Sequence, residues 1–371
     1  MNLTSAITGR PYVGKTTLFN LLCGGHATTG AFAGAEGETN VGVAKVPDER
    51  IDKLSALFRP KRTTHAEITY RDLGLAARAE RGASGDAISA KKLGELRTAD
   101  ALIHVVRAFR DPSVPHSLGS VDPGRDLLDL DLELLLADLA VVERRLERIE
   151  PEMRSAKGAE REAREREKAL LQRALGALES ETPLRDLDIE PDELRLVRGY
   201  RFLTLSPQLV AVNVDESDVA APDSVVAPLT AIASRHRGSA VVPVCAKIEG
   251  EIAELSPDEA AAFRAELGIA DPAVERLLRA TYRLLGLISF FTTGEDEVRA
   301  WTVADGIPAQ QAAGAIHSDL DRGFIRAEVI RWDELLRAGS EANARRLGIL
   351  RTEGKTYPVR DGDVLHILFN V

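Results

Sequence analysis

One short stretch near the N-terminus constrains the fold more than any other part of the sequence. Gly9–Thr16 reads G-R-P-Y-V-G-K-T and fits the pattern G-x-x-x-x-G-K-[ST] at every fixed position. The glycines let the backbone curl so that successive N–H groups face phosphate oxygens, and the following helix adds the positive end of its dipole. Lys15 can reach the β- and γ-phosphates, and the Thr16 hydroxyl can ligate Mg²⁺. We therefore expect a phosphate-binding loop (P-loop).

The residues on both sides of this loop support that interpretation. Residues 3–8 form a short β-like run, and residues 17–22 have the spacing of an amphipathic helix. Strand, loop and helix in this order are the setting that the motif requires, whereas a chance match in a glycine-rich turn would not need them. Lys15 is the predicted catalytic cation. The predicted nucleotide contacts in this region are Gly9, Pro11, Tyr12, Val13, Gly14, Lys15, Thr16 and Thr17.

The rest of the first 122 residues, and residues 206–285, read as strands and helices of an α/β nucleotide-binding domain. Three predicted strands, 66–72, 208–216 and 240–247, end in polar residues. Because open α/β sheets bind ligands at the carboxyl ends of their strands, we expect these ends to meet at the P-loop. The residues assigned to the site on this basis are Asp72, for the metal, and Asn213, Val214, Glu216, Ala246 and Lys247, for the nucleotide.

Residues 125–181 have a different pattern. Leucines recur at helical spacing, and Glu and Arg repeatedly fall three or four residues apart, which supports exposed helices. Pro151 and Gly158 are expected to interrupt the pattern. We predict two long antiparallel helices inserted into the α/β domain as an arm; a solvated helix pair with no partner is the open alternative.

From residue 286 the sequence predicts a small β-rich α+β domain. The expected organisation is therefore 1–124 and 206–285 for the nucleotide-binding domain, 125–205 for the helical insertion, and 286–371 for the C-terminal domain.

Composition excludes several classes of protein. The chain has 371 residues, 44% of them hydrophobic, and no apolar stretch approaches the roughly 20 residues of a membrane-spanning helix. The first strand leaves no room for a signal peptide, and Cys23 and Cys245 are far apart, so we expect a cytoplasmic protein without structural zinc. A formal net charge of −10 argues against wholesale DNA binding but leaves room for a local basic surface.

The whole chain resembles the Obg-like ATPase (YchF) family of P-loop NTPases. Its C-terminal segments are the most specific to that family. The segments that carry the resemblance are Gly9–Asn20, Pro47-Asp48 with Arg50, Ala99–Arg107, Val121–Pro123, Asn213–Glu216, Cys245–Glu249, Phe290–Thr292, Glu297–Val303, Gly323–Ile330 and Asp361–Val371.

The resemblance implies a G domain with an inserted coiled-coil arm and a C-terminal β-grasp module called a TGS domain. It also implies slow hydrolysis, a preference for ATP over GTP, and association with the ribosome or ribosomal RNA through the TGS domain and the arm. Magnesium is the expected metal.

Residues 213–216, the segment expected to contact the base, favour ATP over GTP as the ligand. Guanine specificity usually depends on N-K-x-D, but Val214 replaces the Lys and Glu216 the Asp. Asn213 can still offer a donor and an acceptor to adenine. Capping side chains at a strand end are the alternative for Asn213 and Glu216, and a GTPase remains open.

Three positions depart from the family pattern. Tyr12 stands where the family has Asn, and Asp72-Leu73-Gly74 is one residue shorter than D-x-x-G. The switch Thr is missing from its expected place, so Thr39 is the candidate metal ligand in its stead. Since phosphoryl transfer depends on such contacts, we hypothesise that nucleotide binding is kept while hydrolysis and γ-phosphate sensing are weakened. A catalytically silent binding module is the extreme alternative.

The remaining candidates are more readily explained by packing. His104 and both cysteines are predicted core residues, Trp301 and Trp332 are predicted core or interface residues, and His26 is a weak site candidate. After residue 286, acidic residues outnumber basic ones. RNA contact would then need a local basic patch, and a solvated surface is the alternative. The candidate residues are Arg345, Arg346, Arg351 and Lys355.

Overall fold

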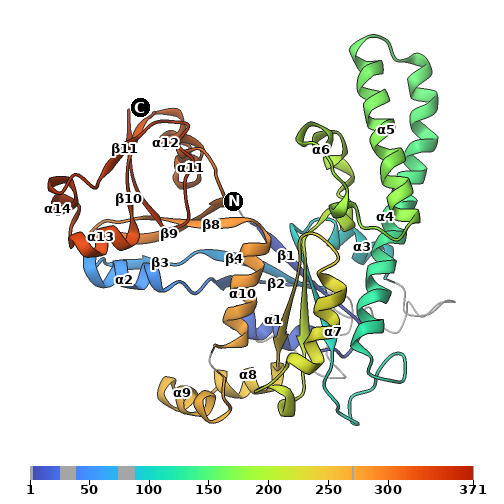
Figure 1. The fold of residues 1–371 in the computed structure, drawn as a ribbon, viewed down its shortest axis with the longest axis horizontal. Coiled ribbons are helices and arrows are strands. Elements are labelled where there is room, and N and C mark those ends of the chain that lie inside the picture. The colour runs from blue at the N-terminus through green and yellow to red at the C-terminus, as the bar shows by residue number, and fades with distance from the viewer. Residues whose placement is uncertain (1–2, 26–38, 74–87, 270, 371) are drawn as a thin grey trace. The chain divides into compact units, whose positions relative to one another are not determined.

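The computed structural model describes residues 3–25, 39–73, 88–269 and 271–370 (Figure 1). The chain divides into two compact units. The P-loop unit comprises Thr4–Gly42 and Tyr70–Leu277, and the C-terminal unit comprises Met1–Leu3, Val43–Thr69 and Leu278–Val371. No helix among the described residues has the length and apolar content needed to cross a bilayer.

A six-stranded sheet carries the P-loop, in the order β2-β4-β1-β5-β6-β7. Its strands are β1 (Thr4–Thr8), β2 (Thr39–Lys45), β4 (Glu67–Leu73), β5 (Ala101–Arg107), β6 (Gln208–Asn213) and β7 (Ser239–Val244). β1, β5, β6 and β7 pair in parallel, with Ile7 opposite Ile103 and Val105 opposite Ala211. Every residue of β1, β5 and β6 is buried, as expected for strands covered on both faces. Their carboxyl ends therefore share one edge of the sheet.

The helices of this unit follow the strands. They are α1 (Lys15–Cys23), α3 (Ala90–Leu96), α4 (Pro123–Ser155), α5 (Ala159–Glu179), α6 (Pro191–Val197), α7 (Asp223–Ala233), α8 (Ala246–Ala253) and α9 (Pro257–Glu266); α10 (Ala273–Leu284) starts in this unit. Two strand predictions ran too far. β6 ends at Asn213 because Asp215 caps a short 3₁₀ turn, and Ala246 and Lys247 open α8 instead of ending β7.

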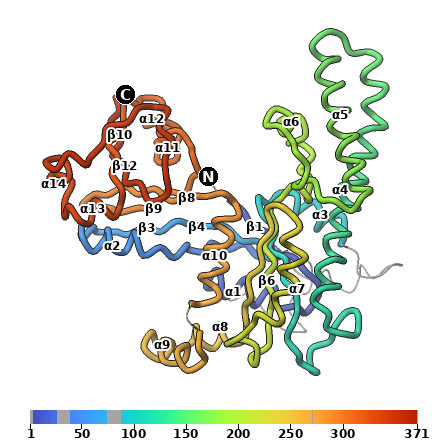
Figure 2. The backbone as a smooth tube through the Cα atoms, viewed as in Figure 1, coloured from blue at the N-terminus to red at the C-terminus, as the bar shows by residue number. Residues whose placement is uncertain are grey.

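The predicted arm is a helical hairpin of α4 and α5, which lie side by side (Figures 1 and 2). Leucines from both helices are buried between them, together with Val142 from α4 and Ala174 from α5. Pro151 does not interrupt α4, contrary to the sequence expectation. It lies near the end of the helix, where Ile149 is fully buried, and this packing carries the helix to Ser155 despite the lost hydrogen bond. Of the two residues expected to interrupt the helices, Gly158 alone lies in the turn between them, with φ of 56°.

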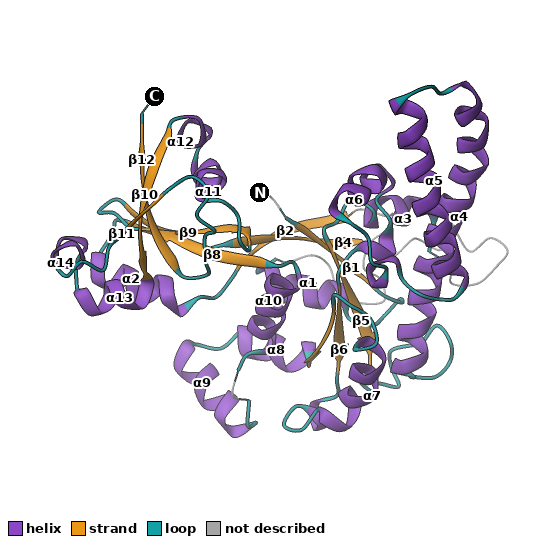
Figure 3. Cartoon of the chain, turned by 45° about the horizontal axis from the view of Figure 1, so that its top comes forward, coloured by secondary structure: helices purple, strands orange, loops and turns teal. Residues whose placement is uncertain are grey.

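The C-terminal unit contains a second six-stranded sheet, in the order β11-β10-β12-β8-β9-β3. Its elements are α2 (Glu49–Phe58), β3 (Arg62–Thr64), β8 (Leu287–Thr292), β9 (Glu297–Ala304), α11 (Ala309–Ile316), α12 (Ser318–Arg322), β10 (Phe324–Arg331), α13 (Trp332–Ala338), α14 (Glu341–Arg346), β11 (Arg351–Glu353) and β12 (Asp363–Phe369). α11 and α12 pack beside β10 (Figure 3), and Phe290, Ala312 and Leu365 belong to the buried core.

Part of segment 1–124, which the sequence assigned to the nucleotide-binding domain, belongs to this C-terminal unit. β3 pairs in parallel with β9, placing Thr63 opposite Val298. Arg50 in α2 pairs with Asp361 at 2.6 Å, and its guanidinium lies 5.3 Å from the centre of the Phe291 ring. A domain boundary placed at residue 286 alone separates these contacting segments. The sequence did not reveal them because a strand as short as β3 leaves no detectable pattern.

Candidate nucleotide-binding site

The P-loop is wound so tightly that two of its positions admit only glycine. Gly9 and Gly14 have φ of 138° and 98°, a region that L side chains avoid. A Cβ on Gly9 would lie 2.4 Å from the Val105 carbonyl oxygen, and one on Gly14 would lie 2.5 Å from the Asn213 amide nitrogen. α1 then begins directly at Lys15, so its free N–H groups open towards the loop.

Lys15 reaches back over this loop. Its Nζ donates to the carbonyl oxygens of Gly9 at 3.0 Å and Arg10 at 2.6 Å, and the residue is buried. Burial, and next the positive charge of Lys92, lower the pKa of Lys15 to about 8, while Asp72 acts in the opposite direction. A buried ammonium without a carboxylate bonded to it gains most from an incoming anion such as a phosphate.

Thr16 and Asp72 come together as predicted for a metal site. The Thr16 hydroxyl donates to Asp72 Oδ2 at 2.7 Å. Asp72 is fully buried, and its Oδ1 has no hydrogen-bond partner within the residues that the structure describes. An orphaned carboxylate oxygen beside a hydroxyl fits a hard divalent cation such as Mg²⁺. No group of three His, Cys, Asp or Glu residues is arranged for a metal in the described part of the chain, so further ligands would come from phosphate and water.

Thr39 is not brought to this pair. Its hydroxyl donates to Glu95 Oε2 at 2.6 Å, whereas the Asn40 amide lies 3.5 Å from Asp72 Oδ2. Successive side chains of a strand point to opposite faces, so with Asn40 facing Asp72 the Thr39 side chain faces away. Thr39 is therefore not positioned as a metal ligand in this structure. Gly74, from the shortened motif, lies outside the described residues.

Asn213 joins two parts of the site. Its amide nitrogen donates to the Val13 carbonyl at 3.0 Å, and its amide oxygen accepts from the Ala246 N–H at the same distance. These bonds use one donor and one acceptor of the amide, which the sequence analysis assigned to adenine. One N–H and one lone pair remain, so base contact by Asn213 stays a prediction.

The residues after Asn213 differ in exposure. Glu216 and Lys247 form an ion pair, and Glu216 raises the pKa of Lys247. Val214 is buried in the apolar cluster around β6, so its side chain is not available to lie along a base. The predicted contact between Val214 and the nucleotide could therefore be made only by the Val214 backbone.

Tyr12 has an unusual backbone conformation. Its φ is 61°, in the left-handed region that Asn tolerates and bulky residues rarely adopt. The Asn that the resemblance led us to expect here would tolerate this conformation, whereas the bulkier Tyr12 is strained in it. Pro11 precedes Tyr12 in the loop, and Thr17 follows Thr16 within α1.

Sequence reasoning missed Arg10, because the variable positions of the P-loop motif carry no signal. Its guanidinium lies 2.7 Å from Asp129 and 3.5 Å from the buried Asp126, both in α4. His116 also contacts Asp126, at 2.9 Å. The P-loop is thereby tied to the base of the helical arm.

Arg107 is a second missed residue. Its buried guanidinium donates to the carbonyl oxygens of four residues after β5, namely Phe109, Asp111, Val114 and Pro115. Arg110 N–H in the same loop donates to Asp215 Oδ2 at 3.0 Å. Arg107 therefore fixes the loop that borders the predicted base-reading segment.

The predicted core residues are buried to different degrees. His104 is buried, and burial, followed by the charges of Lys15 and Arg10, lowers its pKa to about 3, so the ring is neutral at pH 7. Cys245 is buried and Cys23 partly so. Trp301 stacks near Phe290, with ring centres 6.4 Å apart. His26 lies outside the described residues.

Two of the four side chains in the candidate basic patch near the C-terminus pair with acidic residues. Arg345 pairs with Glu328 at 2.8 Å, Arg351 lies 3.3 Å from Glu353, and Arg346 donates to the Asn343 side chain. Of the four side chains, Lys355 alone has no ion pair or side-chain hydrogen bond with any described residue. This favours the solvated-surface interpretation over RNA contact.

Comparison with known proteins gives a consistent result. A family model for the "50S ribosome-binding GTPase" MMR_HSR1 matches residues 4–133, and the model YchF-GTPase_C, described as "Protein of unknown function (DUF933)", matches residues 287–370. The "Ribosome-binding ATPase YchF" of Bacillus subtilis is 42% identical and that of Pasteurella multocida 40%, each over all of both chains. The solved Schizosaccharomyces pombe YchF GTPase superimposes with a TM-score of 0.85 at 30% identity, covering 99% of this chain and 98% of the other.

The parallel sheet and the glycine-fixed loop with its buried lysine define a P-loop NTPase fold, as the sequence predicted. End-to-end similarity to the curated relatives then assigns the chain more narrowly: it belongs to the YchF family.

Proposed function

We propose that this chain is a Mg²⁺-dependent nucleotide-binding protein that prefers ATP to GTP, hydrolyses it slowly and acts as a ribosome-associated switch in the cytoplasm. One observation carries the proposal. Among the residues that the structure describes, the buried Lys15 bonds to carbonyl oxygens beside the Thr16–Asp72 pair, and Asp72 Oδ1 has no hydrogen-bond partner. This arrangement supports a combined site for phosphates and a divalent cation.

Slow hydrolysis is supported by the second half of the site. Tyr12 occupies a strained position where its family has Asn, and Thr39 is bonded to Glu95. The groups that would report the γ-phosphate are thus altered, while the groups that bind phosphate are kept. The switch role is supported by the contacts from Arg10 to Asp126 and Asp129, which connect the P-loop to the arm.

The partner is inferred from relatives. Curated relatives from several bacteria carry the name "Ribosome-binding ATPase YchF". By that similarity the helical arm and the C-terminal unit, proposed to be a TGS domain, are the expected contacts with ribosome or ribosomal RNA. The division at residues 125, 206 and 286 belongs to the same proposal.

A GTPase is the second candidate, because the solved structural neighbour is titled a YchF GTPase. Asp215 is bonded to Arg110 and Ser217, and Glu216 to Lys247, so base reading depends on how readily the Glu216–Lys247 pair opens. A Glu216→Asp variant, with Asp218→Asn as the matched control, tests this residue directly.

The decisive experiment measures affinities for ATP, GTP and ADP with and without Mg²⁺ on one preparation, followed by co-sedimentation with ribosomes over a salt series. We expect ATP to bind at least about tenfold more tightly than GTP, a difference of about 1.4 kcal/mol. Equal affinities would refute the ATP preference, and unchanged affinity without Mg²⁺ would refute the metal site. Absence of nucleotide-dependent co-sedimentation would refute the switch.

A further inference from the structure

A concave pocket lies outside the P-loop site, in the segment that joins the arm to β6. It is formed by α6 and two 3₁₀ turns, Arg198–Tyr200 and Leu203–Leu205, and has a volume of about 360 Å³. Its lining residues are Leu194, Arg195, Val197, Arg198, Arg201, Phe202 and Leu205. A pocket of this size accommodates a small ligand or one or two side chains of a partner.

The floor of the pocket is apolar. Val197 and Phe202 are almost completely buried beneath it, and Leu205 is partly buried. Leu194 lies on the rim of the pocket, and 41% of its surface is exposed. Exposed aliphatic surface next to a concave apolar floor favours an apolar group as the occupant.

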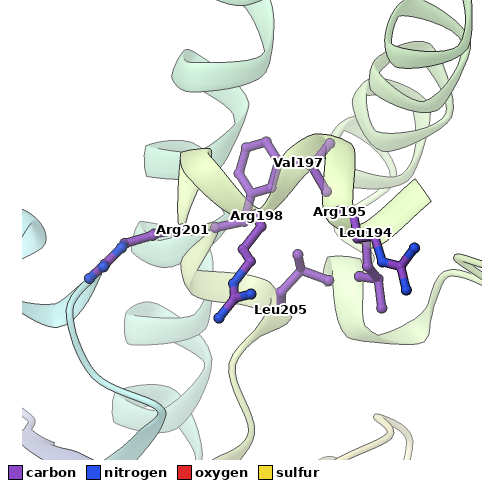
Figure 4. A pocket seen from close by; sticks show the side chains of 7 residues that line it. Leu194, Arg195, Val197, Arg198, Arg201 and Leu205 are labelled. Atoms are coloured by element: carbon purple, nitrogen blue, oxygen red, sulfur yellow. The ribbon is translucent and has the colours of Figure 1, made fainter. Parts of the chain in front are cut away.

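The rim is positively charged. Three arginines recur at every third position, and Figure 4 shows the Arg195 and Arg201 side chains on either side of Arg198. Arg195 pairs with Asp192 at 3.0 Å, but Arg198 and Arg201 form no ion pair or side-chain hydrogen bond with any residue that the structure describes. The whole chain has a net charge of −10, so two guanidinium groups without an acidic partner among the described residues make the rim of this pocket locally positive.

We propose that this pocket binds a short acidic peptide segment of a protein partner. An aliphatic or aromatic side chain of the peptide fills the cavity, and its carboxylates pair with Arg198 and Arg201. Guanidinium groups suit this role because they bind carboxylates through two parallel hydrogen bonds. The apolar anchor supplies buried area, and the charged rim sets the choice of partner.

A nucleic acid would explain the arginines but not the apolar floor. Single-stranded nucleic acids bind by stacking bases on exposed aromatic rings, and Phe202 is 3% exposed. The peptide therefore accounts for both features of the pocket. The proposal goes beyond the nucleotide-dependent function and does not require it.

Fluorescence anisotropy on the full-length protein tests the proposal. The probe is a labelled short peptide with a Leu-Phe pair flanked by Asp and Glu; matched peptides carry Ser in place of Leu-Phe, or Gln in place of the acids. We expect saturable binding of the first peptide only. Arg198→Glu combined with Arg201→Glu should weaken it at least about tenfold, because like charges then face each other.

Two further variants separate the alternatives. Leu194→Ser should weaken the peptide several-fold, and Arg144→Glu, which changes an exposed arginine of α4, should change affinity less than about twofold. Circular dichroism and an unchanged thermal unfolding midpoint verify the fold of each variant. Equal binding of the Ser peptide, no effect of the double reversal, or binding of oligo(U) lost on reversal but not on Leu194→Ser would each overturn the proposal, the last in favour of RNA. Failure of the wild-type protein to bind nucleotide would refute the proposed nucleotide function and would not overturn the peptide proposal.

Discussion

Lys15 and Thr39 illustrate two sides of the same site that are organised differently. On the phosphate side, Lys15 lies over the loop, Thr16 is bonded to Asp72, and Asn213 fixes the loop to α8. On the switch side, Thr39 is bonded to Glu95. Among the described residues, the phosphate-side groups are thus held together by side-chain contacts, whereas Thr39 is held away from the Thr16–Asp72 pair. This difference suggests that affinity and turnover can be separated by mutation.

The largest effect should come from the phosphate side. Lys15→Ala removes the buried cation, and we expect nucleotide affinity to fall roughly 10²-fold because a charge-assisted contact is lost. Isothermal titration calorimetry measures the change, and Lys45→Ala, an exposed lysine of β2, is the matched control. Wild-type affinity in Lys15→Ala would mean that the P-loop does not bind phosphate.

Asp72→Asn should have the next largest effect. The amide keeps the shape of the side chain but not its charge, so the gain in affinity on adding Mg²⁺ should shrink by about tenfold. Titrations with Mg²⁺ and with EDTA measure that gain, and the EDTA arm serves as the internal control. An undiminished Mg²⁺ effect would remove Asp72 from the metal site.

The lowered pKa of Lys15 predicts a pH dependence. Between its folded pKa of about 8 and the ordinary value of 10.5, the unfolded chain holds a proton that the folded chain lacks, so stability without nucleotide rises with pH in this window. Nucleotide binding needs the charged amine, so affinity should be constant below about pH 8 and fall up to about tenfold per unit above it. Calorimetry in buffers of different ionisation enthalpy should detect proton uptake. Lys15→Arg should flatten the profile, and a flat wild-type profile would contradict the assignment.

The smallest expected change is on the switch side. Tyr12→Asn relieves a left-handed conformation, and we expect the free energy of unfolding to rise by about 1 kcal/mol. Single-turnover hydrolysis should rise several-fold while affinity stays within about twofold, because the loop backbone is unchanged. A fall in stability would show that Tyr12 makes contacts that outweigh its strain.

The sequence revealed the parts of the site that local patterns encode. The P-loop was predictable because its glycines and lysine have fixed spacing, and β5 because its apolar run is buried on both faces. The Arg10–Asp129 contact was not, since it joins residues 119 positions apart, Arg10 occupies a variable position of the P-loop motif and Asp129 lies in no motif. The expectation that Pro151 interrupts its helix was wrong because packing holds α4 together there. The strand β3 was missed because three residues are too few to show an alternating pattern.

Single-turnover hydrolysis of bound ATP, with saturating protein and Mg²⁺, tests the separation of binding from catalysis most directly. We predict tight binding together with a rate below about 10⁻² per second, as for P-loop enzymes that lack a complete set of transition-state contacts. Tight binding with a rate of about 1 per second or faster would contradict it.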